Sequence, residues 1–268
     1  MQILAVIPAR YQSQRLPGKP LARMGDRPDS PTLVQCVYEA AKSYAAFSRV
    51  IVATESAKIA TCVRDFGGEV ELTSNTHETG TDRIAEVAAR HPEYDVVVNV
   101  QGDQPFVHPH MLNQLVAPYL TEKALPDMTT LACPLDLDND IENPNVAKVI
   151  CDRHSNALYF SRAPIPYFRQ PRAAPVYRHL GLYAFRADFL ATYTQLKSTP
   201  LEQCERLEQL RVLEHGYRIR VCQTETATIE INTPEDLAAA QAFIKEKLHT
   251  MSAMPTRPQG PYDNRPPV

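Results

Sequence analysis

The sequence lacks the segments that would carry a protein into or across a membrane. Its longest apolar runs, such as Ile3–Ile7 and Val96–Val98, fall far short of the roughly 20 residues that span a bilayer. The chain enters a strand-like run at its start, with no charged segment before it and no cleavage site after it. We therefore expect a cytoplasmic protein without a signal peptide and without membrane insertion.

Blocks of lysine and arginine of the length that binds nucleic acid are also absent. The formal net charge is −3 and the isoelectric point is about 6.2, so we expect no nucleic-acid partner. The six cysteines include no CxxC pair, and the CxxH fragment from Cys151 to His154 has no second pair to complete a zinc site. The simplest interpretation is a set of reduced thiols in a cytosolic protein.

Strand-like and helix-like segments alternate through the first half of the chain. Hydrophobic residues make up 44% of the 268 residues, which allows a sizeable core. The strand-like runs are almost continuously apolar, which is typical of parallel strands covered on both faces. Repeated strand–helix units predict an α/β fold with a doubly wound, mostly parallel sheet. The predicted strands are 3–7, 50–53, 70–72 and 96–100, and the predicted helices lie around 33–41, 59–66 and 84–89.

The pattern changes after about residue 125. Predicted strands at 128–132, 147–151, 157–160 and 180–185 are followed by predicted helices at 201–215 and 234–248. The last helix has Thr233 as its expected N-cap and Pro234 at its first position. We interpret 128–190 as a subdomain inserted into the sheet of a single domain, 1–250. The remaining segment, 251–268, is dense in proline and is expected to be disordered.

A loop rich in cations, Pro8 to Pro20, follows the first predicted strand. Ligands of an open α/β sheet bind beyond the carboxyl ends of its strands, so Arg10, Arg15 and Lys19 stand where a ligand is expected. Their charges suit the negative oxygens of a triphosphate, although a merely solvated basic loop has the same composition. The loop is not a Walker A loop, because Pro20 follows Lys19, and the strand is followed by no GxGxxG dinucleotide motif.

Two further segments place polar groups at the ends of predicted elements. Gly80–Arg83 opens a helix, where backbone N–H groups and the Thr81 hydroxyl can hold a ligand, or where Thr81 is simply the N-cap. Gln101–Asp103 follows the most hydrophobic strand. An aspartate at the end of such a strand suits a hard cation, although glycine and aspartate also form ordinary turns.

These segments belong to a longer series of motifs. After PARYQSQRLPGKPL (8–21) come HETGTDR (77–83), NVQGDQP (99–105), NPNVAKV (143–149), ALYFSRAPIP (157–166), RHLGLYAFR (178–186), PLEQCERLEQLR (200–211) and NTPEDL (232–237). In this order the motifs resemble the 3-deoxy-manno-octulosonate (Kdo) cytidylyltransferase family. The resemblance covers about residues 1–248. It implies a Rossmann-like nucleotidyltransferase fold, with the inserted subdomain serving sugar binding and dimer formation in a homodimer.

The resemblance also implies an activity and its residues. CMP would pass from CTP to the anomeric hydroxyl of Kdo, an acidic eight-carbon sugar, with release of pyrophosphate and for lipopolysaccharide biosynthesis. The implied catalytic residues are Lys19 and Asp103, and the implied ligands of Mg²⁺ are Asp103 and Asn232. The implied nucleotide-binding residues are Arg10, Arg15, Lys19, Thr81, Arg83 and Gln101. The implied sugar-binding residues are Arg162, His179, Tyr183, Glu208 and Gln209.

Two departures from the family pattern remove negative charge. Gln104 stands where the family usually has glutamate, and Asn232 stands where it usually has a metal-binding aspartate. An asparagine can coordinate a cation through its carbonyl oxygen but brings no charge. Metal affinity is then lower, or Glu230 or Asp236 compensates.

Other functions stay open beside this one. Kdo and its 8-amino analogue differ at one terminal group, so the sequence does not separate them. A sugar phosphate would suit a second basic cluster, formed by Arg162, Arg169, Arg172, Arg178 and Arg186. A non-catalytic nucleotide-binding relative, which lost its metal at Asn232, is the alternative from another class.

Overall fold

The computed structural model describes residues 1–12, 15–170, 174–225 and 227–252. The prediction of a disordered tail lies, from residue 253 onward, outside these residues. No helix within them is both long and apolar enough to cross a membrane. The six cysteines are free thiols, of which Cys133 is buried and Cys204 is exposed.

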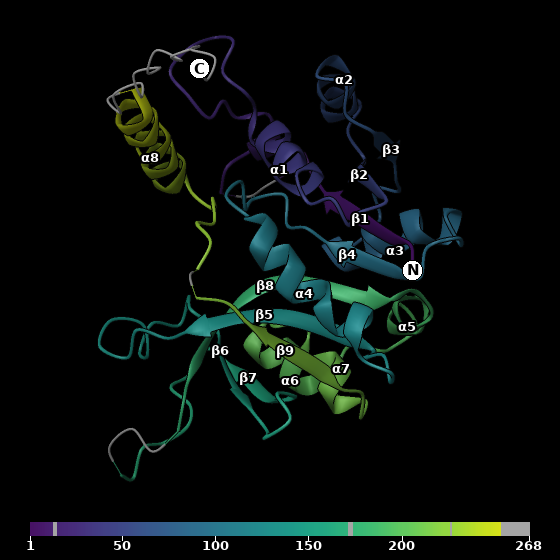
Figure 1. Cartoon of the computed structure of the whole chain (residues 1–268), viewed down its shortest axis with the longest axis vertical. Helices are drawn as coiled ribbons and strands as arrows, with labels where there is room; N and C mark the ends of the chain where they lie inside the picture. The colour runs from purple at the N-terminus through teal and green to yellow at the C-terminus, as the bar shows by residue number, and fades with distance from the viewer. Residues whose placement is uncertain (13–14, 171–173, 226, 253–268) are drawn as a thin grey trace, which may run out of the picture.

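A nine-stranded sheet forms the centre of the molecule (Figure 1). Its first part is parallel and contains, in spatial order, β3 (Val70–Leu72), β2 (Arg49–Thr54), β1 (Ile3–Pro8) and β4 (Val96–Asn99). The sheet continues through β8 (Tyr177–Arg186), β5 (Met128–Pro134) and β9 (Ile219–Gln223). Along this path through the described residues β8 alone runs against the others, so the prediction of a mostly parallel sheet is confirmed.

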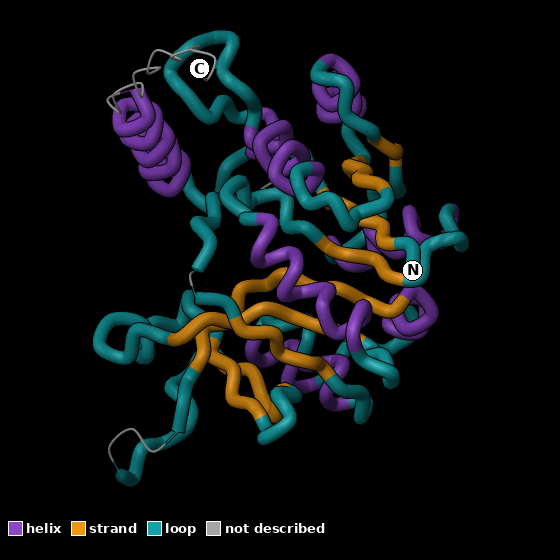
Figure 2. Tube along the Cα trace, in the orientation of Figure 1, coloured by secondary structure: helices purple, strands orange, loops and turns teal. Residues whose placement is uncertain are grey.

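Helices cover both sides of the sheet, as Figure 2 shows. One face carries α1 (Leu33–Lys42), α2 (Ala57–Asp65), α4 (Pro109–Thr121) and α8 (Pro234–Ser252). The other carries α3 (Gly80–Arg90), α5 (Ala187–Tyr193) and α7 (Leu210–Glu214), with α6 (Pro200–Glu205) packed beside α7. Strand β1 supplies Ile3 and Ile7 to the first core and Leu4 and Val6 to the second. This two-sided burial explains its continuous apolar sequence and confirms the doubly wound α/β fold.

The predicted inserted segment, 128–190, contributes strands to the main sheet. Its strands β5 and β8 lie on the main path, and β8 is the neighbour of β4. Strands β6 (Lys148–Cys151) and β7 (Ala157–Ser161) pair with each other and branch from the sheet where β6 meets β8. The role of this segment in dimer formation stays a prediction.

The sequence misplaces some elements in the second half. The single helix predicted at 201–215 is wrong, because Arg206 takes the left-handed conformation (φ 56°) between α6 and α7. Helix α4 contains Pro118, a residue that usually ends a helix, and it was not predicted. Strand β9 was not predicted either. The expected N-cap of α8 is supported, because the Thr233 hydroxyl accepts the N–H of Asp236 at 3.2 Å.

Candidate active site

A first pocket, of about 250 Å³, lies where β1 and β4 end. These strands are parallel neighbours, so the loops that follow them emerge side by side. Gly102 allows their close approach, because a Cβ atom there would lie 2.6 Å from the carbonyl oxygen of Pro8. The pocket is lined by Pro8, Ala9, Arg10, Gln12, Lys19, Pro20, Gly80, Gln101, Gly102 and Asp103. Four of the residues predicted to serve the nucleotide or its metal therefore meet here: Arg10, Lys19, Gln101 and Asp103.

The Lys19 ammonium joins three segments of the chain. Its Nζ lies 2.9 Å from Asp103 Oδ2 and 2.8 Å from the carbonyl oxygen of Ile231. The backbone N–H of Ile231 in turn donates to the carbonyl of Asp103 at 2.9 Å. Residues far apart in sequence are thus held in one cluster of oxygen atoms with a cation between them.

The two arginines of the same loop have different partners. Arg10 Nη2 is buried and has no hydrogen-bond partner within the described part of the chain. Arg10 also lines the pocket, so its guanidinium is placed to bind an anion there. Arg15 donates through Nη2 to Asn232 Oδ1 at 3.3 Å, which brings the predicted second metal position next to this loop.

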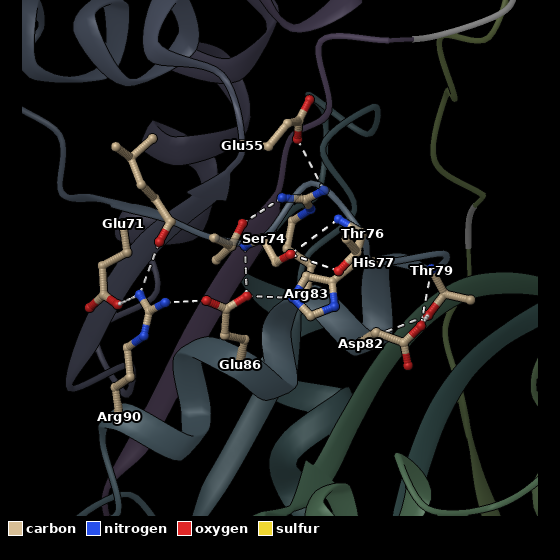
Figure 3. Close-up of polar contacts among 12 residues, drawn as sticks. Glu55, Glu71, Ser74, Thr76, His77, Thr79, Asp82, Arg83, Glu86 and Arg90 are labelled. Carbon is tan, nitrogen blue, oxygen red and sulfur yellow. Dashed lines mark hydrogen bonds and ion pairs between the residues drawn. The ribbon is translucent and has the colours of Figure 1, made fainter.

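The start of α3 is capped two residues earlier than the sequence suggested. Thr79, and not Thr81, is the N-cap, and it forms a capping box with Asp82, as Figure 3 shows. The simple capping role weighed for Thr81 is therefore wrong. The Thr81 hydroxyl instead donates to Glu208 Oε1 at 2.9 Å, across to the predicted sugar residues.

Arg83 is buried, with 1% of its surface exposed. It contacts Glu55 Oε2 at 3.0 Å (Figure 3). Its Nη1 also donates to Thr73 Oγ1 at 2.5 Å. Burial lowers its pKa, and this effect exceeds the opposing influence of the Glu55 charge. Glu55 also accepts the backbone N–H of Tyr11 at 2.8 Å. Arg83 thus contacts the cation-rich loop indirectly, through Glu55, which binds the backbone of Tyr11. Arg83 itself does not line the first pocket.

A second pocket, of about 240 Å³, opens beside β8. It is lined by Asn145, Val146, Ala147, Arg162, Arg178, His179, Gly181, Tyr183, Arg206, Leu207, Glu208, Gln209 and Glu230. All five predicted sugar-binding residues are members of this set. Sequence reasoning did not single out Asn145, Arg206 or Gly181 for any role. The left-handed turn that brings Arg206 here has no signature in the sequence.

A chain of hydrogen bonds orders one wall of this second pocket. The Tyr183 hydroxyl donates to Gln209 Oε1 at 3.1 Å, and Gln209 Nε2 lies 3.4 Å from His179 Nδ1. The Thr130 hydroxyl is committed as a donor to the carbonyl of Leu182, so it accepts from His179 Nε2 at 2.9 Å. This assigns the Nε2–H tautomer to His179, with Nδ1 accepting from Gln209. Burial lowers the pKa of His179 to about 3, so the ring is neutral.

Charged groups complete the second pocket. Arg162 donates to the carbonyl oxygens of Glu205 and Pro144, at 2.8 and 2.9 Å. Burial raises the pKa of Glu208. The proposed five-arginine cluster is not assembled here: Arg162 and Arg178 line the pocket, Arg186 pairs with Asp127 and Asp188 elsewhere, Arg169 is exposed, and Arg172 lies outside the described residues.

Two contacts join the pockets. Gln101 Nε2, in the lining of the first, donates to the carbonyl of Gly181, in the lining of the second, at 3.0 Å. Gly181 has φ +65°, a conformation that other residues adopt only with strain. The hydrogen bond between Thr81 and Glu208 is the other link. A ligand in one pocket therefore lies next to a ligand in the other.

Glu230 lies where the two departures from the family pattern meet. Gln104 Nε2 donates to Glu230 Oε1 at 3.2 Å, and Asn232 Nδ2 lies 3.5 Å from Glu230 Oε2. Burial, and then the charge of Asp103, raise the pKa of Glu230. Asp236 is engaged differently, because its Oδ2 accepts the backbone N–H groups of Asn232 and Thr233 at 2.8 Å each.

Comparison with known proteins places the chain in a family. The family model described as "Cytidylyltransferase" matches residues 4–219. The 3-deoxy-manno-octulosonate cytidylyltransferase of Acaryochloris marina is 64% identical over 92% of this chain and 98% of its own length. The enzyme of the same name from Synechococcus elongatus is 51% identical over 92% of this chain and 100% of its own.

Solved structures agree with these relatives. The structure of a CMP:2-keto-3-deoxy-manno-octonic acid synthetase complexed with CTP superposes with a TM-score of 0.85, at 39% identity, over 92% of this chain and 100% of that one. A 4-diphosphocytidyl-2C-methyl-D-erythritol synthase from Anaerococcus prevotii shares the fold at a TM-score of 0.59 and 13% identity, over 91% of this chain and 98% of its own. The chain belongs to the 3-deoxy-manno-octulosonate cytidylyltransferase family.

Proposed function

We propose that this chain transfers CMP from CTP to the anomeric hydroxyl of Kdo, giving CMP-Kdo and pyrophosphate. The observation that carries the proposal is the pair of joined pockets. One has cations at the ends of parallel strands, and the other has a polar lining that contains all five residues expected to bind the sugar. The family and its relatives of the same name support this assignment.

In the first pocket the loop cations neutralise the triphosphate. Arg10 offers an unused donor, while Arg15 and Lys19 extend along the loop toward Asn232 and Asp103. Charge neutralisation lets the sugar hydroxyl oxygen approach the α-phosphorus as the bond to the departing pyrophosphate breaks, and the hydroxyl proton is released to solvent. Alignment of the two substrates provides the rest of the rate enhancement, so this chain needs no covalent intermediate.

In the second pocket fixed dipoles and charges orient the sugar. The hydrogen-bond chain from Tyr183 to Thr130 fixes the amide of Gln209 and the neutral ring of His179 against rotation. Arg162 and Arg178 provide positive charge for the sugar carboxylate. The contacts Gln101–Gly181 and Thr81–Glu208 then set the distance between the two substrates.

The oxygen cluster around Asp103 fits Mg²⁺. Magnesium in such enzymes takes one or two carboxylates and completes its coordination with phosphate oxygens and water. The Lys19 ammonium lies between Asp103 Oδ2 and a backbone carbonyl, and this contact supports a role for the cluster in binding cations. Asp103 and the Asn232 amide oxygen are the proposed ligands. When bound, the ion would screen the negative oxygens of the triphosphate.

One assay tests the function: pyrophosphate release with CTP, Mg²⁺ and one acceptor at a time. We expect turnover with Kdo, and none with a sugar phosphate. The 8-amino analogue in the same assay defines the acceptor range. Binding of CTP without turnover of any acceptor would instead establish the non-catalytic alternative.

We propose further that the protein is a cytoplasmic homodimer, as the family pattern implies. Sedimentation equilibrium of the purified chain should give twice the monomer mass of 30.0 kDa. A single 30.0 kDa species at micromolar concentration would contradict the dimer.

A further inference from the structure

Two neutral side chains in the active site face a single carboxylate. Gln104 and Asn232 both stand where the family usually has acidic residues, and both direct an amide N–H group to Glu230. Amide donors on both oxygens favour the ionised carboxylate, against the burial and the Asp103 charge that raise its pKa. A carboxylate therefore lies between Gln104 and Asn232, neither of which carries one.

The backbone next to Glu230 is held in place by two residues of the first pocket. Ile231 is fully buried in the core, and its N–H and carbonyl are held by Asp103 and Lys19. The side chains on either side of it, Glu230 and Asn232, lie close enough for their polar atoms to be 3.5 Å apart. Glu230 and Asn232 therefore lie on the same side of this segment, which Lys19 and Asp103 hold through the backbone of Ile231.

The other acidic candidate in this segment has a different task. Asp236 Oδ2 accepts two backbone N–H groups at the start of α8, and the Thr233 hydroxyl accepts its N–H in return. A carboxylate in a capping box satisfies the helix terminus and is held there. Glu230 instead lines the second pocket, next to the first.

We propose that Glu230 is the second carboxylate of the Mg²⁺–CTP site in this chain and replaces the charge missing at residues 104 and 232. The proposal rests on the magnesium-dependent function proposed above. It adds that the second carboxylate lies nearer the sugar pocket than the family pattern places it, because Glu230 also lines that pocket. Asn232 then adds a neutral ligand and also positions the carboxylate, with its amide held between Arg15 and Glu230.

Calorimetric titration with CTP, without sugar, tests this. Affinity is measured in EDTA and again in saturating Mg²⁺, and the ratio of the two reports the contribution of the metal. For Glu230→Gln we expect that ratio to fall about tenfold. Affinity in EDTA should stay equal or rise, because a charge that repels phosphate is gone. A merely structural defect would weaken binding under both conditions.

Two further variants complete the test. Asn232→Asp in the Glu230→Gln background should restore the ratio to within about threefold of wild type, because it returns one carboxylate to the site. Glu235→Gln, which removes an exposed carboxylate nearby, is the matched control and should leave the ratio unchanged.

An unchanged ratio in Glu230→Gln, equal losses with and without metal, or no recovery in the double variant would each overturn the proposal. A wild-type protein whose CTP affinity does not respond to Mg²⁺ would also overturn it. That result would in addition remove the magnesium dependence from the proposed function, whereas the variant results alone would leave that function intact.

Discussion

The nucleotide pocket and the sugar pocket differ in the side chains that line them. The nucleotide pocket is built from charged groups, and one of them, Arg10, keeps a donor without a partner in the described residues. The wall of the sugar pocket is a closed series of hydrogen bonds in which Tyr183, Gln209, His179 and Thr130 are each engaged. A triphosphate needs charge, whereas a sugar needs fixed direction, and the two linings differ accordingly.

This difference predicts how each pocket fails. Loss of one charge in the nucleotide pocket leaves its neighbours unbalanced and acts mainly on turnover. Loss of one link in the sugar pocket leaves buried donors or acceptors unpaired, and it acts on sugar affinity and on the fold. Kinetic parameters for CTP and for the sugar should therefore separate variants of the two pockets.

The largest effect is expected at Asp103. Asp103→Asn removes the carboxylate that faces Lys19 at 2.9 Å and that is the proposed metal ligand. We expect kcat to fall by about 100- to 1000-fold, with a far-ultraviolet spectrum like that of the wild type. Steady-state pyrophosphate release at millimolar Mg²⁺ measures it. Asp65→Asn, at an exposed position, is the control. Wild-type kcat in Asp103→Asn would remove Asp103 from the catalytic site.

Gln209 provides the contrasting case in the sugar pocket. Gln209→Leu leaves the Tyr183 hydroxyl and His179 Nδ1 without their partners. We expect the KM for Kdo to rise by about 10- to 100-fold, since one or two hydrogen bonds of about 1–2 kcal/mol are lost, and the KM for CTP to stay within about twofold.

The control for Gln209 is Gln203→Leu, on the exposed surface of α6. It should change neither Michaelis constant. An equal rise of both constants in Gln209→Leu would show that the pockets cannot be separated in this way, and the comparison between them would fail.

The nucleotide pocket was also the more predictable of the two from sequence. Buried parallel strands have continuous apolar sequences, so β1 and β4 were found, and the residues after them, Lys19 and Asp103, followed from topology. The role of Glu230 depends on contacts with Gln104, 126 positions away in the chain, which no local pattern contains.

The second half of the chain offered weaker local signals. Arg206 adopts the left-handed backbone conformation without being a glycine, so the sequence predicts one helix where the structure has two short ones. Thr79 and Thr81 both suit an N-cap. Thr79 takes the role because Asp82, three residues later, completes a capping box with it, and the Thr81 hydroxyl donates to the distant Glu208 instead. The five sugar residues came from the family resemblance, since each has an ordinary structural explanation by itself.

A smaller effect, on stability, tests whether one wall of the sugar pocket is a closed network of neutral side chains. The pKa of His179 is lowered to about 3, whereas an unfolded histidine titrates near its ordinary value of 6.5. The neutral ring therefore favours the folded state fully above about pH 6.5, and this contribution is lost as the pH falls toward 3. The expected slope is about 1.4 kcal/mol per pH unit.

The measurement compares the free energy of unfolding of the wild type and of His179→Asn between pH 7 and 4. The difference between them should shrink as the pH falls. His154→Asn, at an exposed histidine, should run parallel to the wild type. A constant difference for His179→Asn would mean that the ring is already accessible to protons in the folded state.

The smallest effect is expected from the end of the chain, whose described part, up to Ser252, contributes no residue after Glu230 to either pocket lining. Helix α8 packs on the core through Leu237, Ala240 and Ile244, and Phe243 contacts Phe106 edge-on, at 5.2 Å between ring centroids. The sequence beyond Ser252 is dense in proline and has few apolar residues to add to this packing. We expect a chain that ends at Ser252 to keep kcat and both Michaelis constants within about twofold.

A chain that ends at Asp236 lacks the whole apolar face of α8, so the segment that contains Glu230 and Asn232 loses its support. This shorter chain should lose the effect of Mg²⁺ on CTP affinity and should keep its preference among acceptor sugars. Equal damage from both truncations would show that the residues after 252 support the fold or the site.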